Sequence, residues 1–305
     1  MQLYIDEASL IVYKALASET RISILNQLAI SPLTISELSQ SMGITKAIMS
    51  RHIKMLCDAH LIKQSDSYAS SDKRKKVFSL QVDRAEIVFP RKIYYPFEKK
   101  TSEIKLGYFS DFSVKPTCGL VSASSVIGAI DDPRVFVSND RVNASLLWLA
   151  DGYVEYKIPN TLEPGQTPEM IELSMELSSE FPISNNAWPS DITFYINNTK
   201  IGTWTCPGNF SDVRGKLTPA WWNSAYSQYG LLKHIRITRD NTGIDGVWFS
   251  SAKLSDLNLN DSPFITLRIG IEPNAVNKGG LTLFGDSFGN HPQNILLTVY
   301  YSEHD

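Results

Sequence analysis

Cysteine is scarce in this sequence, and its few copies are far apart. The 305 residues include three cysteines, Cys57, Cys118 and Cys206, and five histidines that are equally scattered. Three cysteines without a pairing pattern argue against a disulfide framework and indicate a reducing compartment. No group of thiols and imidazoles has the spacing of a zinc or arsenic site. We therefore expect neither a metal site nor any other cofactor.

Long uninterrupted hydrophobic runs are also absent. No apolar stretch approaches the roughly 20 residues that a membrane helix needs. The first ten residues, MQLYIDEASL, carry acids where a secretory leader has a basic region. A composition of 43% hydrophobic and 20% charged residues is typical of an ordinary globular protein. We expect the chain to be cytoplasmic and not to bind a membrane.

The motifs of common hydrolases and nucleotide-binding enzymes are missing as well. There is no GxSxG elbow, no HExxH pair and no phosphate-binding glycine loop, and GDSFGN (285–290) is interpreted as a glycine-rich turn. A glycosidase needs two carboxyl groups roughly 5–10 Å apart. Acids that could form such a pair, though no motif singles them out, are Glu155, Glu172, Glu176, Asp191 and Asp212. We expect a protein that is not an enzyme, with a carbohydrate-active enzyme as the less favoured alternative.

Residues 34–59 have the pattern of two helices joined by a tight turn. Thr34 is a good N-cap, and Glu37 follows at the spacing of a capping box. Gly43 is expected to end this short helix, and Thr45 to cap the longer helix that follows. Two helices with a short glycine-containing turn predict a helix-turn-helix.

The longer helix is expected to bury one face and to present cations and hydroxyls on the other. The expected buried stripe consists of Ile48, His52, Leu56 and Ala59, with Ile53 beside them, and His52 is interpreted as a packing residue. A polar face of this kind fits a major groove lined with phosphates and base edges. The residues that we expect to contact DNA from this helix are Thr45, Lys46, Ser50, Arg51 and Lys54.

A basic hairpin is predicted directly after this helix. Leu61–Lys63 and Val77–Leu80 have the composition of short strands, and a polar tip (65–71) lies between them. Four consecutive cations, Lys73, Arg74, Lys75 and Lys76, follow the tip. Such a hairpin is a wing, which can contact the neighbouring DNA backbone or minor groove.

The predicted DNA-binding region and the rest of the chain have opposite net charges. Residues 1–85 hold 11 Lys and Arg against 8 Asp and Glu, a net charge of +3. The remainder holds 18 against 24, a net charge of −6, and the two sum to the total of −3. An acidic remainder would be repelled by a duplex, so we expect it to have another task.

The first quarter of the chain resembles the winged helix-turn-helix of ArsR-type bacterial repressors. The resemblance lies in KALASETRISIL (14–25), ISELSQSMGITKAIMSRHIKML (35–56) and AHLI (59–62). It implies a DNA-binding homodimer, with dimerisation helped by a helix around residues 6–16. Metal-sensing members carry paired cysteines where this chain has ISELSQSM, so the inducer is expected not to be a metal.

From about Leu106 onward the pattern changes to strands punctuated by Pro, Gly, Asn and Asp. The ten runs expected as strands are GYFSDFSVKP, RVFVSN, SLLWLADGYVEYKIP, MIELSMELSSEFP, DITFYINNTKIGTWT, KHIRITRD, GVWFSSAKLS, PFITLRIGIEP, GGLTLFG and NILLTVYYS. They predict an antiparallel, jelly-roll-like β-sandwich. The fold class expected is therefore multidomain α+β, with a winged helix at 1–85, a proline-broken connector at 86–105 and the sandwich at 106–305.

Aromatic residues gather in four segments, 188–191, 202–210, 214–222 and 227–234, which are expected to be loops that meet at one rim of the sandwich. Trp faces stack on the apolar side of sugar rings, while acid, amide and guanidinium groups bind hydroxyls. The residues expected to bind a small polar ligand, with a carbohydrate as the leading candidate, are Trp188, Asp191, Trp204, Asn209, Asp212, Arg214, Trp221, Trp222, Gln228 and Tyr229. The alternative is that these aromatics fill the core, which a sandwich of this size also requires.

The second region also resembles a β-sandwich domain fused to ArsR-type helices in an uncharacterised group of bacterial predicted regulators. The residues that carry this resemblance include PTCGL (116–120), GYVEYKIPN (152–160), WPSDITFYIN (188–197), GTW (202–204) with PG (207–208), RGKLTPAWW (214–222) and GGLTLFG (279–285). The sequence as a whole predicts a transcriptional regulator, a repressor or an activator, whose operator binding responds to a small ligand. A sandwich that only dimerises or docks another protein is the alternative.

Overall fold

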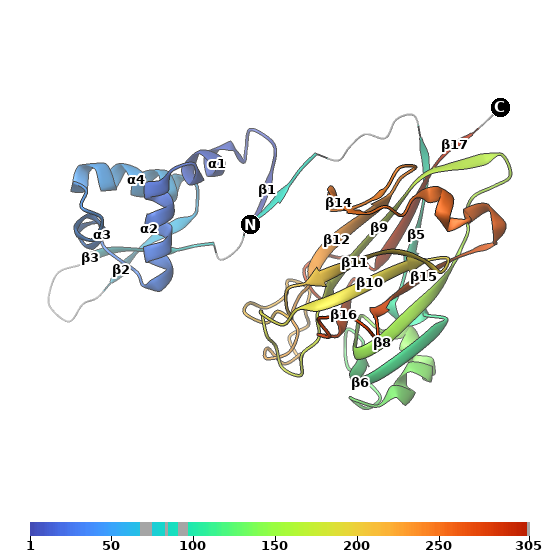
Figure 1. Ribbon diagram of the computed structural model, residues 1–305. Coiled ribbons are helices and arrows are strands. Elements are labelled where there is room, and N and C mark those ends of the chain that lie inside the picture. Colours follow the sequence, from blue (N-terminus) through green and yellow to red (C-terminus); the bar gives the residue numbers. More distant parts are fainter. Residues whose placement is uncertain (68–74, 83–84, 91–96, 304–305) are drawn as a thin grey trace. The chain divides into compact units, whose positions relative to one another are not determined.

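The chain folds into two compact units, Met1–Tyr94 and Tyr95–Asp305 (Figure 1). This computed structural model describes residues 1–67, 75–82, 85–90 and 97–303. None of the helices in these ranges is both long enough and apolar enough to span a membrane. Because each unit has its own core, the two are described separately.

The first unit contains four helices and two small β-sheets. The elements are β1 (Gln2–Tyr4), α1 (Leu10–Leu16), α2 (Glu19–Ile30), α3 (Ile35–Met42), α4 (Lys46–Asp58), β2 (Ile62–Ser67), β3 (Lys75–Leu80) and β4 (Glu86–Val88). Strands β2 and β3 form an antiparallel hairpin, while β1 pairs in parallel with β4. Ile24, Leu38, Met49, Leu56 and Phe78 are buried at the centre. The predicted winged helix-turn-helix is confirmed.

The second unit is a sandwich of two antiparallel layers. One layer runs in the order β11 (Thr199–Cys206), β10 (Ser190–Ile196), β15 (Phe264–Ile271), β8 (Leu146–Pro159), β6 (Asp111–Val121) and β7 (Val126–Ile127). The other contains β14 (Val247–Ser250), β13 (Thr242–Ile244), β12 (Leu231–Ile237), β9 (Gln166–Ser178), β17 (Ile295–Glu303) and β5 (Glu98–Ile104). One short strand joins the two layers, and the predicted β-sandwich is confirmed (Figure 1).

A short strand, β16 (Leu281–Phe284), makes the junction between the layers. It pairs with β8 on one side and with β9 on the other, so that the hydrogen-bonded sheet is continuous. On the opposite side of the sandwich the Ser250 hydroxyl donates to the carbonyl of Ile201, which brings β14 against β11. The sandwich is therefore nearly closed, and few of its strand edges are left open.

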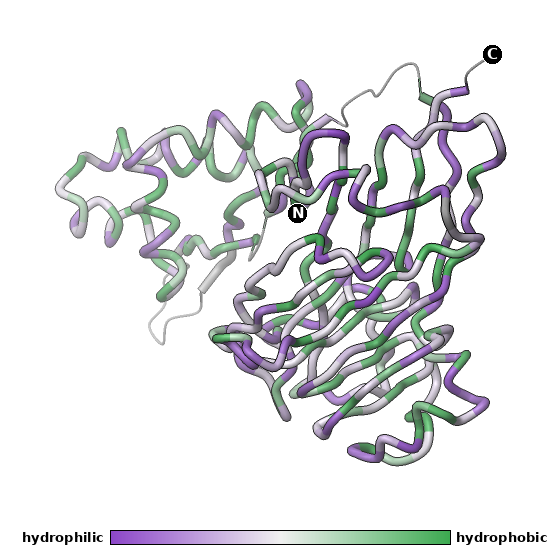
Figure 2. Tube along the Cα trace, turned by 45° about the vertical axis from the view of Figure 1, so that its right-hand side comes forward, coloured by the Kyte–Doolittle hydropathy of each residue, from purple (hydrophilic) through white to green (hydrophobic). Residues whose placement is uncertain are grey.

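The core lies between the layers and follows the period of two that strands impose. Along β15, Ile265, Leu267 and Ile269 are fully buried while the residues between them are partly exposed. Hydrophobic residues recur between hydrophilic ones along many of the strands (Figure 2). Each buried side chain of this size stabilises the fold by about 1.5–3 kcal/mol. Packing between the two layers holds the strands in place, and the ends of the strands in turn position the loops that connect them.

Two sequence-based expectations for this unit were wrong. The run RVFVSN was expected to be a strand, but Pro133–Val137 form a 3₁₀ helix, in which the Asp132 side chain accepts from the amide of Arg134 and proline occupies the first turn. A capping acid followed by proline starts a helical turn regardless of β-branched residues beyond it. The segment expected as a connector, 86–105, contains β4 in the first unit and β5 in the second.

Candidate functional site

Side-chain caps fix the geometry of the turn between α3 and α4. The amide of Thr34 donates to Glu37 Oε2 (2.7 Å), and the amide of Glu37 donates to Thr34 Oγ1 (3.3 Å), which completes the predicted capping box. Gly43 ends α3 in the left-handed region, with φ of 66°. The amide of Ile48 donates to Thr45 Oγ1 (3.4 Å). These contacts define where α4 begins.

The buried face of α4 is rotated from the one expected. Met49, Ile53 and Leu56 are buried, whereas Ile48 is 46% exposed. The prediction that Ile48 belongs to the buried stripe was therefore wrong. Ile48 and Met49 are neighbours, and either can start a stripe at helical spacing. The stripe that starts at Met49 is the one buried, because all of its members are apolar. Burying the stripe that starts at Ile48 would also bury the polar ring of His52 fully.

The opposite face of α4 is exposed and carries the predicted polar residues. Thr45, Lys46, Ser50, Arg51 and Lys54 are all exposed. Ser50 and Lys54 are four residues apart, and Arg51 lies three residues before Lys54, so these three share one face. In the hairpin, Lys76 is exposed and Lys75 begins β3, whereas Lys73 and Arg74 lie outside the described residues.

Arg21 of α2 ties the helices together, a role that the sequence analysis missed. Its guanidinium is buried and donates to the carbonyls of Ala15 (2.6 Å) and Lys14 (2.8 Å) near the end of α1. It also lies 3.5 Å from Nδ1 of His52 in α4. Burial, and then the charge of Arg21, lower the pKa of His52. Arg21 lies at helical spacing from the buried Ile24 and Leu28, which is the signal that could have revealed its inward position.

The cysteines are not gathered into a metal-binding group. Cys57, Cys118 and Cys206 are free, and burial is the main cause that raises the pKa of each thiol. Within the described ranges, no three His, Cys, Asp or Glu residues are positioned to hold a metal ion.

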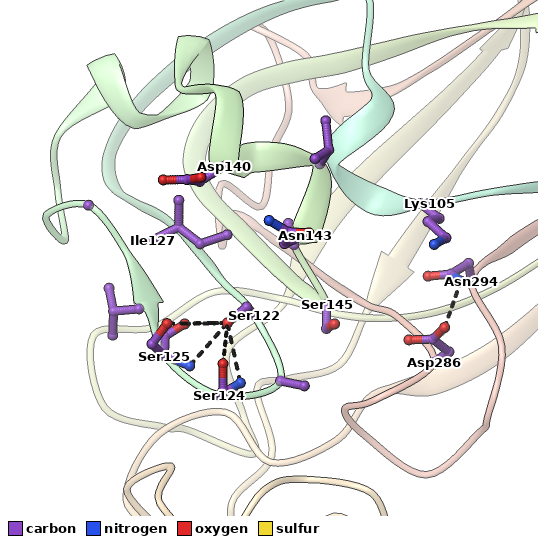
Figure 3. Close-up of a pocket in the computed structure, with 15 residues that line it drawn as sticks. Lys105, Ser122, Ser124, Ser125, Ile127, Asp140, Asn143, Ser145, Asp286 and Asn294 are labelled. Atoms are coloured by element: carbon purple, nitrogen blue, oxygen red, sulfur yellow. Dashed lines mark hydrogen bonds between the residues drawn. The ribbon is translucent and has the colours of Figure 1, made fainter.

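A polar hollow of about 560 Å³ opens on the second unit (Figure 3). Its polar lining consists of Lys105, Ser122, Ser124, Ser125, Asp140, Asn143, Ser145, Asp286 and Asn294. Ser122 Oγ accepts from the amides of Ser124 (3.2 Å) and Ser125 (3.0 Å), so the serine turn is held from within. Hydroxyl, amide and carboxylate groups together can both donate to and accept from a polyhydroxylated molecule.

The exposed Trp221 stands beside this hollow. Its side chain is 43% exposed, and its indole Nε1 donates to the carbonyl of Ala123 (2.8 Å), a residue that lines the hollow. The adjacent Trp222 is only 6% exposed, and its Nε1 donates to the carbonyl of Ser227 (3.0 Å). The two neighbouring tryptophans therefore lie in different environments, one at the surface and one buried.

The segments expected as loops at one rim meet only in part, because Asp191 and Trp204 lie in the strands β10 and β11 and not in loops. Asn185 pairs with Asn209, and Phe210 pairs with Tyr229, through isolated β-bridges. Most of the residues predicted to bind ligand in this region instead hold the loops together. Asn209 Nδ2 donates to the Ser179 carbonyl (2.8 Å), and the Tyr229 hydroxyl donates to Asp212 (2.7 Å).

The remaining predicted ligand residues are distributed over several places. Gln228 is fully buried, and Arg214 donates to the carbonyls of Pro219 and Trp222. On the neighbouring strands β10 and β11, Asp191 accepts from Thr205 (2.7 Å), while Trp204 lies under the ammonium of Lys233 at 4.8 Å. Trp188 packs edge-on against Phe181, with ring centroids 4.8 Å apart. The structure therefore does not unite the ten residues around one cavity.

The carboxyl groups considered for catalysis are each held by a different partner. Glu155 pairs with Arg268 (2.7 Å) and Glu172 pairs with Arg236 (2.5 Å). Glu176 is buried and accepts from three backbone amides, those of Gly230 (2.8 Å), Asn290 (2.9 Å) and His291 (2.9 Å). This carboxylate anchors two loops, a role that sequence spacing did not reveal.

The chain is similar to known regulators over its first unit. Residues 18–64 match the model of the bacterial regulatory protein, arsR family. Over 58 residues the chain is 43% identical to the HTH-type transcriptional regulator TcaR of Staphylococcus aureus (strain Newman). That alignment covers 19% of this chain and 38% of TcaR, so the chain spans well under half of this relative. The predicted ArsR-type helix-turn-helix is confirmed for this segment.

Two solved structures are similar to separate parts of the chain. HlyU from Vibrio cholerae N16961 is 22% identical, with 26% of this chain and 84% of HlyU covered and a TM-score of 0.22. The carbohydrate-binding module CBM36, in complex with calcium and xylotriose, is 8% identical, with 65% of this chain and 98% of the module covered and a TM-score of 0.28. Both TM-scores are too low to bear on function.

Proposed function

We propose that this chain is a DNA-binding transcriptional regulator whose α4 reads an operator. The observation that carries the proposal is the exposed face of Ser50, Arg51 and Lys54, opposite a stripe that packs into the core, within a segment that matches the arsR family model. Arginine can donate two hydrogen bonds to a guanine edge, and lysine neutralises phosphates. The hairpin β2–β3 supplies further backbone contacts from its basic residues.

We also propose that the chain binds the operator as a homodimer. Leu10 and Ile11 on α1 are 43% and 47% exposed, which leaves apolar surface on the helix that the family resemblance assigns to dimerisation. Two copies would then address two half-sites about one helical turn apart, about 34–36 Å along the duplex. Analytical ultracentrifugation of the wild-type chain and of the Leu10→Lys variant measures this association. The wild type should sediment as a dimer, and the variant should shift toward the monomer.

Gel-shift titration tests the DNA-binding proposal. Arg51→Ala should weaken operator binding by about 1–3 kcal/mol and relax base preference. Lys157→Ala, which removes one exposed charge from the second unit, is the control and should leave the affinity unchanged. Neutralising Lys73, Arg74, Lys75 and Lys76 together should weaken binding to all sequences and flatten its salt dependence. Unchanged affinity in both the Arg51 and the hairpin variants would refute the proposal.

We further propose that the second unit senses a small polar ligand, with a carbohydrate as the candidate, in the hollow beside Trp221. The support is chemical: the partly exposed indole of Trp221 stands beside hydroxyl, amide and carboxylate groups. A ligand that prefers one arrangement of the chain by about 1.4 kcal/mol changes operator affinity tenfold.

A sugar screen followed by variants tests the sensing proposal. Mono- and oligosaccharides are screened by thermal shift, and each hit is titrated against the operator complex. Trp221→Ala and Asn143→Ala should each remove the response to the sugar without changing DNA affinity. Trp204→Phe on β11, away from the hollow, is the control. A response that survives both variants would remove the hollow from the proposal.

A further inference from the structure

A second, smaller cavity of about 200 Å³ lies against the buried Trp222. Its lining consists of Thr117, Ile130, Asp131, Leu146, Trp148, Glu180, Phe181, Pro182, Ile183, Trp222, Tyr226, Ser227 and Thr282. None of these residues belongs to the lining of the polar hollow. The cavity has room for a small molecule only, since drug-sized ligands occupy about 300–1,000 Å³.

Four aromatic residues line the cavity. The ring centroids of Trp148 and Trp222 are 6.2 Å apart, and those of Trp222 and Tyr226 are 5.3 Å apart. Phe181 completes the set. The two indoles are further fixed within a buried cluster that contains Phe284 and Phe288. Faces of Trp and Tyr rings attract cations, most strongly where water is excluded.

Glu180 adds a carboxyl group to this aromatic wall. Its Oε2 lies 2.8 Å from Thr282 Oγ1, and its Oε1 lies 3.3 Å from Thr117 Oγ1. Thr282 Oγ1 also lies 3.1 Å from the carbonyl of Ser179. The hydroxyl of Thr282 has one proton, so it cannot donate to both oxygens. When it donates to the carbonyl, a protonated Glu180 can donate to Thr282 and satisfy both contacts.

The charge of the lining has one sign. Asp131 and Glu180 are its two acids, and the described lining residues include neither Lys, Arg nor His. Burial, with a smaller contribution from the charge of Asp131, raises the pKa of Glu180 to about 8, although hydrogen bonds from Thr282 and Thr117 lower it. Thr117 and Thr282 are engaged with Glu180, and the hydroxyl of Ser227 accepts from Asn209 (2.9 Å). The polar atoms left for a ligand are mainly carboxyl oxygens, which suit a cation better than a neutral polyol.

We propose that this cavity binds a small organic ammonium ion, with the cation over Trp148 and Trp222 and its charge neutralised by Glu180. Binding releases the carboxyl proton of Glu180 to solvent, so a neutral acid becomes the anionic partner of the ligand and no bond other than this O–H bond is broken. The titratable groups that face the ligand are Asp131, Glu180 and Tyr226. The proposal does not depend on the DNA-binding or sugar-sensing functions.

Calorimetric titration with two matched probes tests the proposal. Choline chloride and 3,3-dimethylbutan-1-ol have nearly the same shape, but only choline carries a charge. Choline should bind at least ~10-fold more tightly if cation–π and carboxylate contacts hold it. Its affinity should rise roughly 20-fold from pH 6.5 to 8.5, because Glu180 must lose a proton on binding. Titrations in buffers of different ionisation enthalpy should show release of close to one proton at pH 7.

Variants test whether choline binding and its pH dependence arise from this cavity. Glu180→Gln keeps a neutral hydrogen-bonding group, so it should fold normally, abolish proton release and remove the pH dependence of choline binding. Trp148→Leu should abolish binding, and Trp221→Phe outside the cavity should not change it. Equal binding of the two probes, or choline binding that does not depend on pH in the wild-type chain, would overturn the proposal. A neutral sugar that binds in place of choline and is lost in Glu180→Gln would also overturn it.

Discussion

The two units place their candidate functional residues in opposite ways. In the first unit, Ser50, Arg51 and Lys54 lie on one helix within five positions of each other. In the second unit, the polar hollow combines Lys105, residues 122–128, Asp140, residues 142–145, Asp286 and Asn294. A helix presents a surface that its own spacing determines, whereas a sandwich assembles a surface from loops that only its topology brings together. Local spacing therefore predicts the first kind of site and not the second.

The largest expected effect distinguishes the buried tryptophan from the exposed one. Trp222→Ala should destabilise the second unit by about 3–5 kcal/mol, because it removes a buried ring that packs on Trp148 and Phe288. Trp221→Ala should lower the free energy of unfolding by less, about 1–3 kcal/mol, since it removes one hydrogen bond and an edge-on contact with Trp222 from a ring that is 43% exposed. Chemical denaturation followed by circular dichroism measures both. Equal costs would show that the two indoles are not in different environments.

Glu180 makes the stability of the second unit depend on pH. Burial raises the pKa of this carboxyl to about 8, so the folded state keeps a proton that the unfolded state loses above about pH 4.3. The free energy of unfolding should therefore fall as pH rises from about 5 to 8, by at most about 1.4 kcal/mol per pH unit. Glu180→Gln should remove this slope. A slope that persists in the variant would assign the effect to another group.

A smaller effect is expected at Arg21 in the first unit. Arg21→Met keeps the length of the side chain but removes its bonds to the carbonyls of Lys14 and Ala15, at a cost of about 1–3 kcal/mol. The transition of the first unit should move to lower denaturant concentration while that of the second stays in place. Lys14→Met, at an exposed position on α1, is the control. A shift of both transitions would show that the units unfold together.

The smallest effect, none at all, is expected from metals. Cys57 lies within the helix-turn-helix, near the end of α4, and burial raises the pKa of its thiol above the ordinary value. Zinc, cadmium and arsenite should show no tight stoichiometric binding by calorimetry, and operator binding should not respond to them. Submicromolar zinc binding that releases DNA would contradict the expectation.

Features that depend on residues close together in the sequence were predicted, and features that depend on residues far apart in the sequence were not. The capping box of Thr34 and Glu37 spans three positions, and it was predicted correctly along with both helix starts. The sequence analysis wrongly placed Ile48 instead of Met49 in the buried stripe of α4, because both of these adjacent apolar residues fit the helical period. The sandwich class followed from strand composition, but β5 was taken for a connector because its partner in β17 lies nearly 200 residues away. The aromatic rim was predicted only in part. Phe210 and Tyr229 do meet at a loop junction, but Asp191 and Trp204 lie in strands, and most of the polar side chains bind carbonyls and hydroxyls of neighbouring loops.

The pairing of β5 with β17 also dictates an order of events in folding. Ile104 lies opposite Ile295, and β17 fills the place between β5 and β9. Until Ile295–Glu303 have been synthesised, β9 and β5 have no partner on these edges, and the second unit cannot complete its sheet. Contacts this distant in sequence make folding slow, whereas the first unit, rich in local contacts, can fold as soon as it leaves the ribosome. A growing chain would thus carry a finished helix-turn-helix while its sandwich still exposes open strand edges, and truncation before Ile295 would make that aggregation-prone state permanent.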